Sequence, residues 1–346
     1  MNTILTSEMD DIRYILGEGT ESLRGRRILI TGATGLIGLY MIDFLIWLNQ
    51  QYDMDLKIYA AAQSLEKLNK RFGNQKQNLI FLECDLSLPE TFTTQEQFDF
   101  IIHGASPTDP AIFATNPIGV INTNIIGTMQ ILGNAIKSNA RFLFISSGEV
   151  YGHNTGKSFT ESDPAIISTQ TSRLCYPAAK IACEAACISA AQMHNLDINI
   201  VRPCFIYGHT ISDTSSRVNA QFQRQVISGQ NILLKSAGNQ VRSWCYVADT
   251  VSAILYVLCN GISGETYNIA NPESVASIYE YASILANIAG VEVNFAPGAT
   301  HNRAKKSDSI LNADKLLALG WRPVFDLKTG LQHSFALKSL ACVYNE

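Results

Sequence analysis

Residues 26–38 read Arg-Arg-Ile-Leu-Ile-Thr-Gly-Ala-Thr-Gly-Leu-Ile-Gly, and this stretch decides the fold. The apolar, β-branched run before Gly32 predicts a buried parallel strand, and the apolar run Leu39–Leu48 predicts the helix that follows. Glycines let the backbone turn tightly and approach a pyrophosphate, which then lies at the positive end of the helix. In this strand-to-helix context we interpret the turn as part of a dinucleotide site rather than as a plain turn. Its residues are Gly32, Thr34, Gly35, Leu36, Ile37 and Gly38.

Five more short apolar runs alternate with helical segments such as Asn116–Ala135, which is the pattern of a doubly wound parallel sheet. The runs are Leu56–Ala62, Leu79–Glu83, Phe98–His103, Phe142–Ser147 and Ile198–Arg202. Ligands bind at the carboxyl ends of the strands in such sheets. We therefore expect four residues at predicted strand ends to converge: Gly32, Ser106, Ser147 and Arg202. His103, at the end of an apolar strand, is interpreted as a packed structural histidine.

The alternation of strands and helices ends after Tyr207-Gly208, where polar loops and shorter elements indicate a smaller lobe that covers the site. The predicted fold is α/β, a Rossmann-type doubly wound parallel sheet with a smaller C-terminal substrate-binding lobe. The predicted division is an outer N-terminal extension at 1–24 with a short helix at Asp10–Leu16, a dinucleotide-binding domain at 25–206 with a returning segment near 243–262, and a lobe at 207–242 and 263–346.

The end of the second predicted strand lacks the acid that NAD-binding folds usually place there for the ribose 2′-hydroxyl. Gln63 and Ser64 stand in its place, and they give no charge-based preference between NAD and NADP. Basic residues follow on the next helix, so NADP stays open beside NAD. Asp85, after the third strand, is a candidate acceptor for the adenine amino group. Gly104 and Ala105 are small enough for the chain to pass close under the cofactor.

Tyr176 and Lys180 are four residues apart, so on a helix their side chains lie on one face, one turn apart. An ammonium group beside a phenol favours the phenolate, and the pair can then move a proton near neutral pH. This spacing is common in helices by chance. Its significance comes from the dinucleotide turn and from Ser147, which ends a neighbouring strand.

The composition of the 346-residue chain is that of an ordinary globular protein, 47% hydrophobic and 16% charged. A net charge of -4 gives no reason to expect nucleic acid or an anionic membrane as a partner. The eight cysteines show no zinc-site spacing, so no metal is expected, and they suit a reducing cytosol. We expect a cytoplasmic protein without a signal peptide or a membrane span.

Together these residues resemble the extended short-chain dehydrogenase/reductase family. The resemblance rests on the glycine turn, on Ser147, Tyr176 and Lys180, and on the sequel Val150-Tyr151-Gly152. Further segments resemble the UDP-glucuronate decarboxylase branch of that family. They are Asn116-Pro117-Ile118, the run from Thr123 to Thr128, Arg173 and Cys175 before the tyrosine, Ser216-Arg217-Val218, and the run from Gln240 to Asp249.

The resemblance implies a tightly held NAD and a nucleotide-diphosphate sugar that is oxidised at C4. Tyr176 would be the base, Lys180 and Ser147 its helpers, and Glu149 the group that acts at C5 or C6. The implied cofactor contacts also include Leu86, Asn124 and Pro203. The implied substrate contacts are Ser106, Arg173, Phe205, Arg217 and Arg242, of which the last two resemble diphosphate binders. The family also commonly pairs two helices across a homodimer interface, so we expect a homodimer.

Two positions depart from the family pattern. Dehydratases usually have Asp, and decarboxylases Ser, where this chain has Gly148, and an Asn is often found at the position of Phe205. Decarboxylation, 4,6-dehydration and epimerisation therefore all stay open. Two other classes also stay open: a net reductase that uses exchangeable NADPH, and a catalytically silent dinucleotide-binding sensor. The intact set of Ser147, Tyr176 and Lys180 speaks against the sensor.

Overall fold

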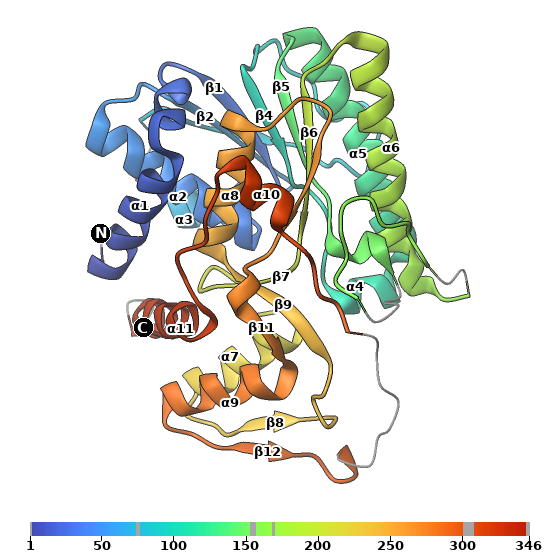
Figure 1. Ribbon diagram of the computed structural model, residues 1–346. Helices are drawn as coiled ribbons and strands as arrows, with labels where there is room; N and C mark the ends of the chain where they lie inside the picture. Colours follow the sequence, from blue (N-terminus) through green and yellow to red (C-terminus); the bar gives the residue numbers. More distant parts are fainter. Residues whose placement is uncertain (1, 74–76, 153–156, 168–169, 300–307, 344–346) are drawn as a thin grey trace.

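Seven parallel strands form the central sheet of the computed structural model, which describes residues 2–73, 77–152, 157–167, 170–299 and 308–343 (Figure 1). Their order across the sheet is β10-β6-β5-β4-β1-β2-β3, and every neighbouring pair is parallel. The strands are β1 (Arg27–Thr31), β2 (Lys57–Ala62), β3 (Leu79–Glu83), β4 (Phe100–His103), β5 (Arg141–Ile145), β6 (Ile198–Pro203) and β10 (Thr266–Ile269). The predicted α/β fold and its six predicted strands are therefore confirmed.

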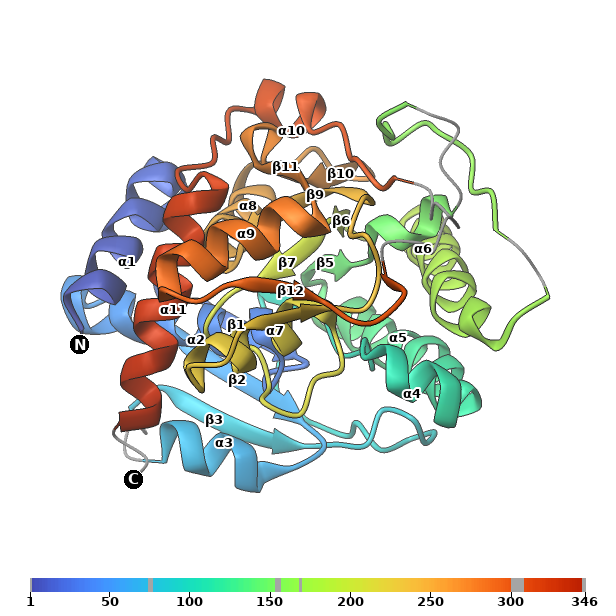
Figure 2. The same ribbon diagram turned by 90° about the horizontal axis from the view of Figure 1, so that it is seen from below.

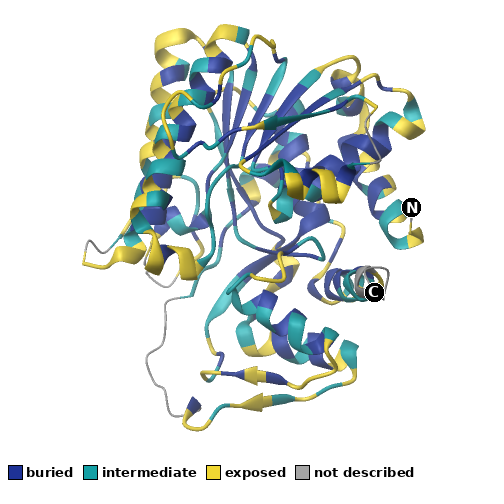
Figure 3. Ribbon diagram, turned by 180° about the vertical axis from the view of Figure 1, so that it is seen from behind, coloured by how far each residue is buried: buried dark blue, intermediate teal, exposed yellow. Residues whose placement is uncertain are grey.

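Helices cover both faces of the sheet because successive strand residues point to opposite sides. Ile28 and Ile30 of β1 pack in one hydrophobic cluster with α2 (Leu36–Tyr52) and α8 (Val247–Asn260). Leu29 packs in a second cluster with α5 (Pro117–Ser138) and α6 (Cys175–His194). Figure 3 shows the strands as a buried layer between these helices.

The lobe lies below the central sheet in Figure 1 and in front of it in Figure 2, and it is built from small sheets and short helices. One sheet has the order β11-β9-β7, and β12 pairs with β8 in the other. The strands are β7 (Phe205–Tyr207), β8 (Ile232–Leu234), β9 (Val241–Tyr246), β11 (Val275–Ser277) and β12 (Val293–Phe295). The helices are α7 (Val218–Ile227), α9 (Ile278–Ala289) and α11 (Leu327–Val343); α3 (Leu65–Phe72), α4 (Pro110–Thr115) and α10 (Asp314–Leu319), which packs against β10, belong to the larger domain.

One boundary of the predicted lobe needs correction, because β10 lies within 263–346 and yet completes the large sheet beside β6. The strand is four residues long and contains a polar Asn268, so no apolar run marks it in the sequence. Asn268 is fully buried, and its amide donates to the carbonyls of Phe159 and Asn312. These bonds satisfy the buried amide, so the polar residue does not disturb the sheet.

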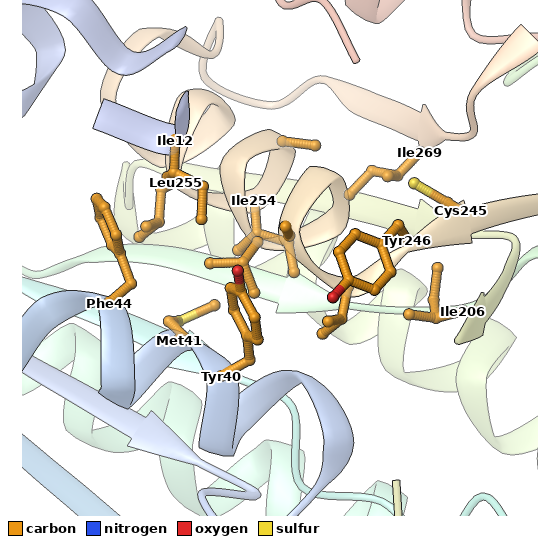
Figure 4. Packing of buried hydrophobic residues seen from close by; sticks show 14 of the residues in the cluster. Ile12, Tyr40, Met41, Phe44, Ile206, Cys245, Tyr246, Ile254, Leu255 and Ile269 are labelled. Atoms are coloured by element: carbon orange, nitrogen blue, oxygen red, sulfur yellow. The ribbon is translucent and has the colours of Figure 1, made fainter. Parts of the chain in front are cut away.

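The N-terminal extension is more deeply integrated than expected. Its helix α1 spans Thr3–Leu16. It ends where predicted but begins seven residues before the predicted start at Asp10. Ile12 is buried in the main hydrophobic cluster (Figure 4). The buried Glu8 carboxylate accepts hydrogen bonds from Tyr40 of α2 (2.5 Å) and Tyr246 of β9 (2.8 Å), so the helix ties the two domains together.

In the described chain, one helix is long and apolar enough for a membrane span by length and composition alone, and it covers Ser172–His194. Half of its apolar window is buried inside the protein, and core helices pass the same test. This helix packs along α5 and presents Tyr176 and Lys180 to the pocket at the strand ends.

Candidate active site

A cavity of about 880 Å³ lies where the carboxyl ends of the strands meet the lobe. Almost every residue that the sequence predicted for the site lines it. From the larger domain these are Gly32, Thr34, Gly35, Leu36, Ile37, Gly38, Gln63, Asp85, Leu86, Gly104, Ala105, Ser106, Ser147, Glu149, Arg173, Tyr176, Lys180 and Pro203; Phe205, Arg217 and Arg242 belong to the lobe.

The glycine turn presents backbone, rather than side chains, to the cavity. Gly32 has a φ of 73°, and a Cβ atom there would lie 2.7 Å from the carbonyl oxygen of Gly104. Gly35 is the N-cap of α2 and offers no side chain to the free N–H groups of the first turn. Backbone donors and the positive end of a helix therefore face the cavity, and they fit a pyrophosphate such as that of NAD.

The far end of β2 carries an amide that is oriented by a carboxylate. Gln63 Nε2 donates to Asp85 Oδ2 at 2.9 Å, while Asp85 Oδ1 accepts from the Ser87 hydroxyl at 2.6 Å. The bond from Ser87 is the main reason that the pKa of Asp85 lies below its usual value. Arg71, one of the basic residues that kept NADP open, pairs with Asp43 at 2.5 Å and does not line the cavity.

Tyr176 is buried in the first turn of α6, where its ring stacks on Phe113 with centroids 5.0 Å apart. Burial, helped by the Glu149 carboxylate and opposed by a hydrogen bond with Ser147, raises the pKa of Tyr176 to about 12. The expectation that Lys180 brings the phenol near neutrality was wrong for the protein alone. Lys180 Nζ donates to the carbonyl of Ile145 at 2.8 Å, and burial lowers the pKa of Lys180 to about 8.

Glu149 and Arg173 form an ion pair at the mouth of the site. Both carboxylate oxygens accept from Arg173 Nη2 at 2.9 Å, and the Arg173 guanidinium lies 5.3 Å from the centre of the Phe113 ring. Because one nitrogen serves both oxygens, this is a close, charge-assisted ion pair rather than a fork-to-fork contact with two parallel bonds. Phe113, on the short helix α4, was missed by the sequence analysis, because six residues give too little periodicity to predict a buried face.

Two further arginines enter the cavity from the lobe side. Arg242 stacks over the Phe205 ring at 4.1 Å and donates to Gln240 Oε1, and burial lowers its pKa to about 10. Arg217 donates to the carbonyl of Thr108 through Nε (3.2 Å) and Nη2 (3.1 Å). The cavity wall thus carries three guanidinium groups around one glutamate, which suits an anionic ligand with several charges.

Gly148 is enclosed by apolar and backbone atoms. A Cβ atom there would lie 2.9 Å from Cδ1 of Leu311 and 3.3 Å from the carbonyl oxygen of Pro203. Leu311 comes from the C-terminal segment, which also brings Ser309 to the cavity wall. No local sequence pattern predicted either contact. The position between Ser147 and Glu149 therefore has no protic side chain and no room for one without repacking.

Two predicted site residues do not reach the cavity wall. Asn124 is 1% exposed, and its Nδ2 donates to the carbonyl of Val120 within α5, so the predicted cofactor contact was wrong. Arg202 was expected to converge with the other strand ends, but it pairs instead with Glu184 of α6 at 2.6 Å. In the described residues, no group of three or more His, Cys, Asp or Glu side chains is placed to hold a metal ion.

Comparison with known proteins gives a family match over residues 28–270, to the model of the NAD dependent epimerase/dehydratase family. UDP-glucuronic acid decarboxylase 6 of Arabidopsis thaliana is 30% identical over 307 residues, which cover 88% of this chain and 86% of that protein. UDP-glucuronic acid decarboxylase 1 of Danio rerio is 28% identical over 308 residues, which cover 88% of this chain and 71% of that protein.

Two solved structures illustrate the similarity of fold. The dTDP-glucose 4,6-dehydratase of Streptomyces venezuelae, with NAD and TYD bound, gives a TM-score of 0.78 at 23% identity and covers 92% of this chain and 98% of its own. The UDP-glucose 4-epimerase of Thermotoga maritima, with UDP-glucose, gives a TM-score of 0.75 at 24% identity. The match covers 91% of this chain and 99% of the epimerase chain.

Proposed function

The chain belongs to the NAD-dependent epimerase/dehydratase family, and we propose that it oxidises a nucleotide-diphosphate sugar at C4 and then acts at C5 or C6. UDP-glucuronate decarboxylation is the reaction we favour. The observation that carries the proposal is the Glu149–Arg173 pair, held at 2.9 Å in the same cavity as Ser147 and Tyr176. A simple C4 epimerase has no need of a carboxylate oriented in this way.

The residues that would hold NAD are those of the glycine turn, Gln63 and Asp85, and Lys180 beside the catalytic tyrosine. NAD, when bound, accepts a hydride from C4 of the sugar and brings a positive nicotinamide ring to the site. Tyr176 takes the proton of the C4 hydroxyl, for which its pKa must fall from about 12. Ser147 donates a hydrogen bond to the oxygen that loses this proton and orients it.

The sugar that has a ketone at C4 can lose a substituent at C5, because the electron pair moves into an enolate at the ketone oxygen. In a decarboxylation the C5–C6 bond breaks, carbon dioxide leaves, and a proton is then added at C5. The hydride taken from C4 would afterwards be returned to that carbon, which restores NAD and the C4 hydroxyl. Glu149 is the group placed to manage that proton, and Arg173 fixes its orientation. Arg217 and Arg242 bind the diphosphate.

Gly148 speaks against a complete 4,6-dehydration, because expulsion of the C6 hydroxyl needs an acid beside it. The neighbouring Leu311 supplies only methyl groups. Decarboxylation needs no such acid, since carbon dioxide leaves without a proton. Epimerisation stays as the competing outcome of the experiment below.

The test is to incubate the full-length protein with UDP-glucuronate, UDP-glucose and dTDP-glucose and to read the products by mass spectrometry. Loss of carbon dioxide from UDP-glucuronate supports the proposal. Loss of water, or an unchanged mass with inverted configuration at C4 in the NMR spectrum of the product, contradicts it. Glu149→Gln should then accumulate reduced cofactor and a 4-keto sugar, because C4 oxidation survives and the later step stops. If Glu149→Gln turns over normally, Glu149 has no chemical role.

The same proposal includes a homodimer formed through α5 and α6. On α5 the exposed apolar residues Ile118, Ile121, Ile125 and Met129 are three or four positions apart and therefore share one face. Ile118 and Met129 are 70% and 57% exposed, which supports burial against a second copy. Sedimentation should give a dimer that Met129→Lys dissociates and that Ile262→Lys, a change on another exposed apolar residue, leaves intact. A monomeric parent protein would refute the interface.

A further inference from the structure

A buried chain of hydrogen bonds connects the end of β1, just before the glycine turn, with α6. His103, at the end of β4, is 1% exposed; its Nδ1 lies 2.7 Å from the Thr31 hydroxyl and its Nε2 lies 3.1 Å from the Thr128 hydroxyl. Thr128 Oγ1 is 3.3 Å from the Cys183 thiol on α6. That thiol lies 3.3 Å from the carbonyl oxygen of Asn124. None of these bonds belongs to the proposed reaction.

The donors and acceptors of this chain permit one direction throughout. Thr31 Oγ1 already accepts the N–H groups of Gly104 and Ala105, both at 3.2 Å, which use its two lone pairs. Its proton is therefore donated to His103 Nδ1, and the ring proton must be on Nε2. The Nε2–H group donates to Thr128, whose hydroxyl donates to the Cys183 sulfur. In the opposite direction the Thr31 proton would lack a partner in a buried site.

The chemistry of the surroundings agrees with a neutral ring. Burial, together with the positive charge of Lys180, lowers the pKa of His103 to about 3. The ring is also stacked on Phe144 with centroids 5.8 Å apart, and the Lys180 ammonium lies 4.6 Å from the centre of that same Phe144 ring. His103 is therefore a fixed connector with one donor and one acceptor, and it holds no proton that the reaction could use.

The hydrogen-bond series ends at Cys183, on the same helix as the catalytic residues Tyr176 and Lys180. Cys183 is three residues after Lys180 and so lies one turn further along the same face of α6. A rotation of α6 about its axis would break the bond between Thr128 and Cys183 and would move Lys180 and Tyr176 with it. Lys180 Nζ adds a second connection between α6 and the sheet, to the carbonyl of Ile145 at the end of β5.

We propose that His103 is a positioning residue that, as the neutral Nε2–H tautomer, holds α6 in register with the glycine turn through Thr31, Thr128 and Cys183. It thereby sets where Tyr176 stands relative to the bound cofactor and sugar. The inference rests on the proposed function only for its turnover measurement. Its other measurement, the tautomer of the ring, is independent of the substrate.

The first test compares Thr128→Val with Thr128→Ser in the full-length protein. Valine keeps the shape of threonine and loses the hydroxyl, whereas serine keeps the hydroxyl and loses a methyl group. We expect Thr128→Val to lower kcat about 10-fold with KM within about twofold, since a misplacement of about 1 Å can cost roughly 100-fold in rate. Thr128→Ser should keep kcat close to the parent value. If Ser is as slow as Val, the methyl packing matters and the proposal is wrong; an unchanged kcat in Thr128→Val also overturns it.

A matched control is available in Thr250, which is equally buried and whose hydroxyl donates to the carbonyl of Tyr246, the residue that caps the start of its own helix. Thr250→Val should leave kcat unchanged, so a loss of rate specific to position 128 is separated from the general cost of removing a buried hydroxyl. Melting temperatures of both valine variants are recorded alongside, to show that each variant is folded when it is assayed.

The second test is NMR of protein labelled with ¹⁵N-histidine, in which His103 is assigned by the signals lost in His103→Asn. We expect the neutral Nε2–H pattern, unchanged across about pH 5–8, where an ordinary histidine titrates. The Nδ1–H tautomer, or a titration in that range, overturns the proposal even if turnover data are lacking. If no nucleotide sugar is turned over while the Nε2–H signature is found, the proposed function fails and the hydrogen-bond chain stands.

Discussion

The half of the cavity under β1 and β2 is made mostly of backbone, whereas the half beside α6 is made of long charged side chains. In the first half, one contiguous turn from Gly32 to Gly38 supplies the helix N-terminus and the close approach to Gly104. In the second half, Glu149 meets Arg173 across 24 positions of sequence, and Arg217 meets Thr108 across 109. The cofactor half is thus a local structure, and the sugar half exists only after the chain has folded.

Because of this difference, the two halves tolerate different kinds of substitution. A backbone cradle tolerates few changes of shape but is indifferent to most side chains, so it can serve many members of a family. Side chains such as Arg242, stacked on Phe205, can change identity without disturbing the sheet. We therefore expect substitutions in the sugar half to change rate and substrate affinity, and substitutions in the cofactor half to change NAD affinity.

The largest effect should come from Tyr176→Phe, which removes the proton-accepting oxygen and keeps the ring stacked on Phe113. General acid–base groups contribute roughly 10²- to 10⁴-fold, and we expect kcat to fall by that factor. NAD affinity and melting temperature should stay near the parent values. Steady-state kinetics and calorimetry measure the three quantities, with Tyr279→Phe, a half-exposed tyrosine of the lobe, as the control. Turnover within about threefold of the parent would remove Tyr176 from the mechanism.

A smaller effect is expected from Arg217→Gln in the sugar half. Hydrogen bonds to charged groups are worth about 1.5–3 kcal/mol, so KM for the nucleotide sugar should rise roughly 10- to 100-fold, with kcat much less affected. Arg224→Gln removes a cation from the same helix at a position that does not line the cavity, and it should leave KM unchanged. Equal effects of the two variants would mean that the diphosphate is bound elsewhere.

The contrast between the halves also explains how far the sequence could predict this protein. Six strands and the glycine turn were predictable, because apolar runs and glycine spacing are written locally. The strand β10 was not, because its burial depends on the amide of Asn268 finding partners from two distant segments. The raised pKa of Tyr176 was not predictable either. The four-residue spacing to Lys180 indicates proximity, but only the fold shows that burial outweighs the neighbouring charges.

Asn124 and Arg202 are residues that the sequence wrongly predicted to reach the cavity. Both lie next to site residues in sequence or at a strand end, and both turn away from the cavity to satisfy buried groups within the helix layer. Leu311, which closes the space beside Gly148, comes from the far end of the chain. Positions along the chain were thus predictable, whereas the direction in which a side chain points depended on packing between distant segments.

A test on the cofactor half is Gly35→Val. The backbone of Gly35 is extended, with φ of -83° and ψ of 171°, which valine adopts readily. An added Cβ meets only the carbonyl oxygen of Gly32 at 3.2 Å, so the fold should survive while the side chain enters the cavity. Overpacking costs about 1–3 kcal/mol, and NAD affinity by calorimetry should fall roughly 10- to 100-fold. An unchanged affinity in Gly35→Val would show that the turn only supports the fold.

The smallest effect is expected from Asp85→Asn, and it asks whether one side chain matters within a half that is mostly backbone. The Asp85 carboxylate accepts from Gln63 Nε2, which leaves Gln63 Oε1 as the acceptor for a ribose hydroxyl. With asparagine in its place the amide of Gln63 loses a charged partner and its fixed orientation, and a neutral hydrogen bond is worth about 0.5–1.5 kcal/mol. NAD affinity should therefore fall about 2- to 10-fold. NADP affinity should fall less or rise, because the carboxylate that would repel a 2′-phosphate is gone.

Glu83→Gln is the control. It removes a negative charge from the end of the neighbouring strand β3 at a position that does not line the cavity, so it controls for charge alone. A ratio of NAD to NADP affinity that moves equally in both variants would show that the field of the strand ends, rather than the Gln63–Asp85 bond, selects the cofactor.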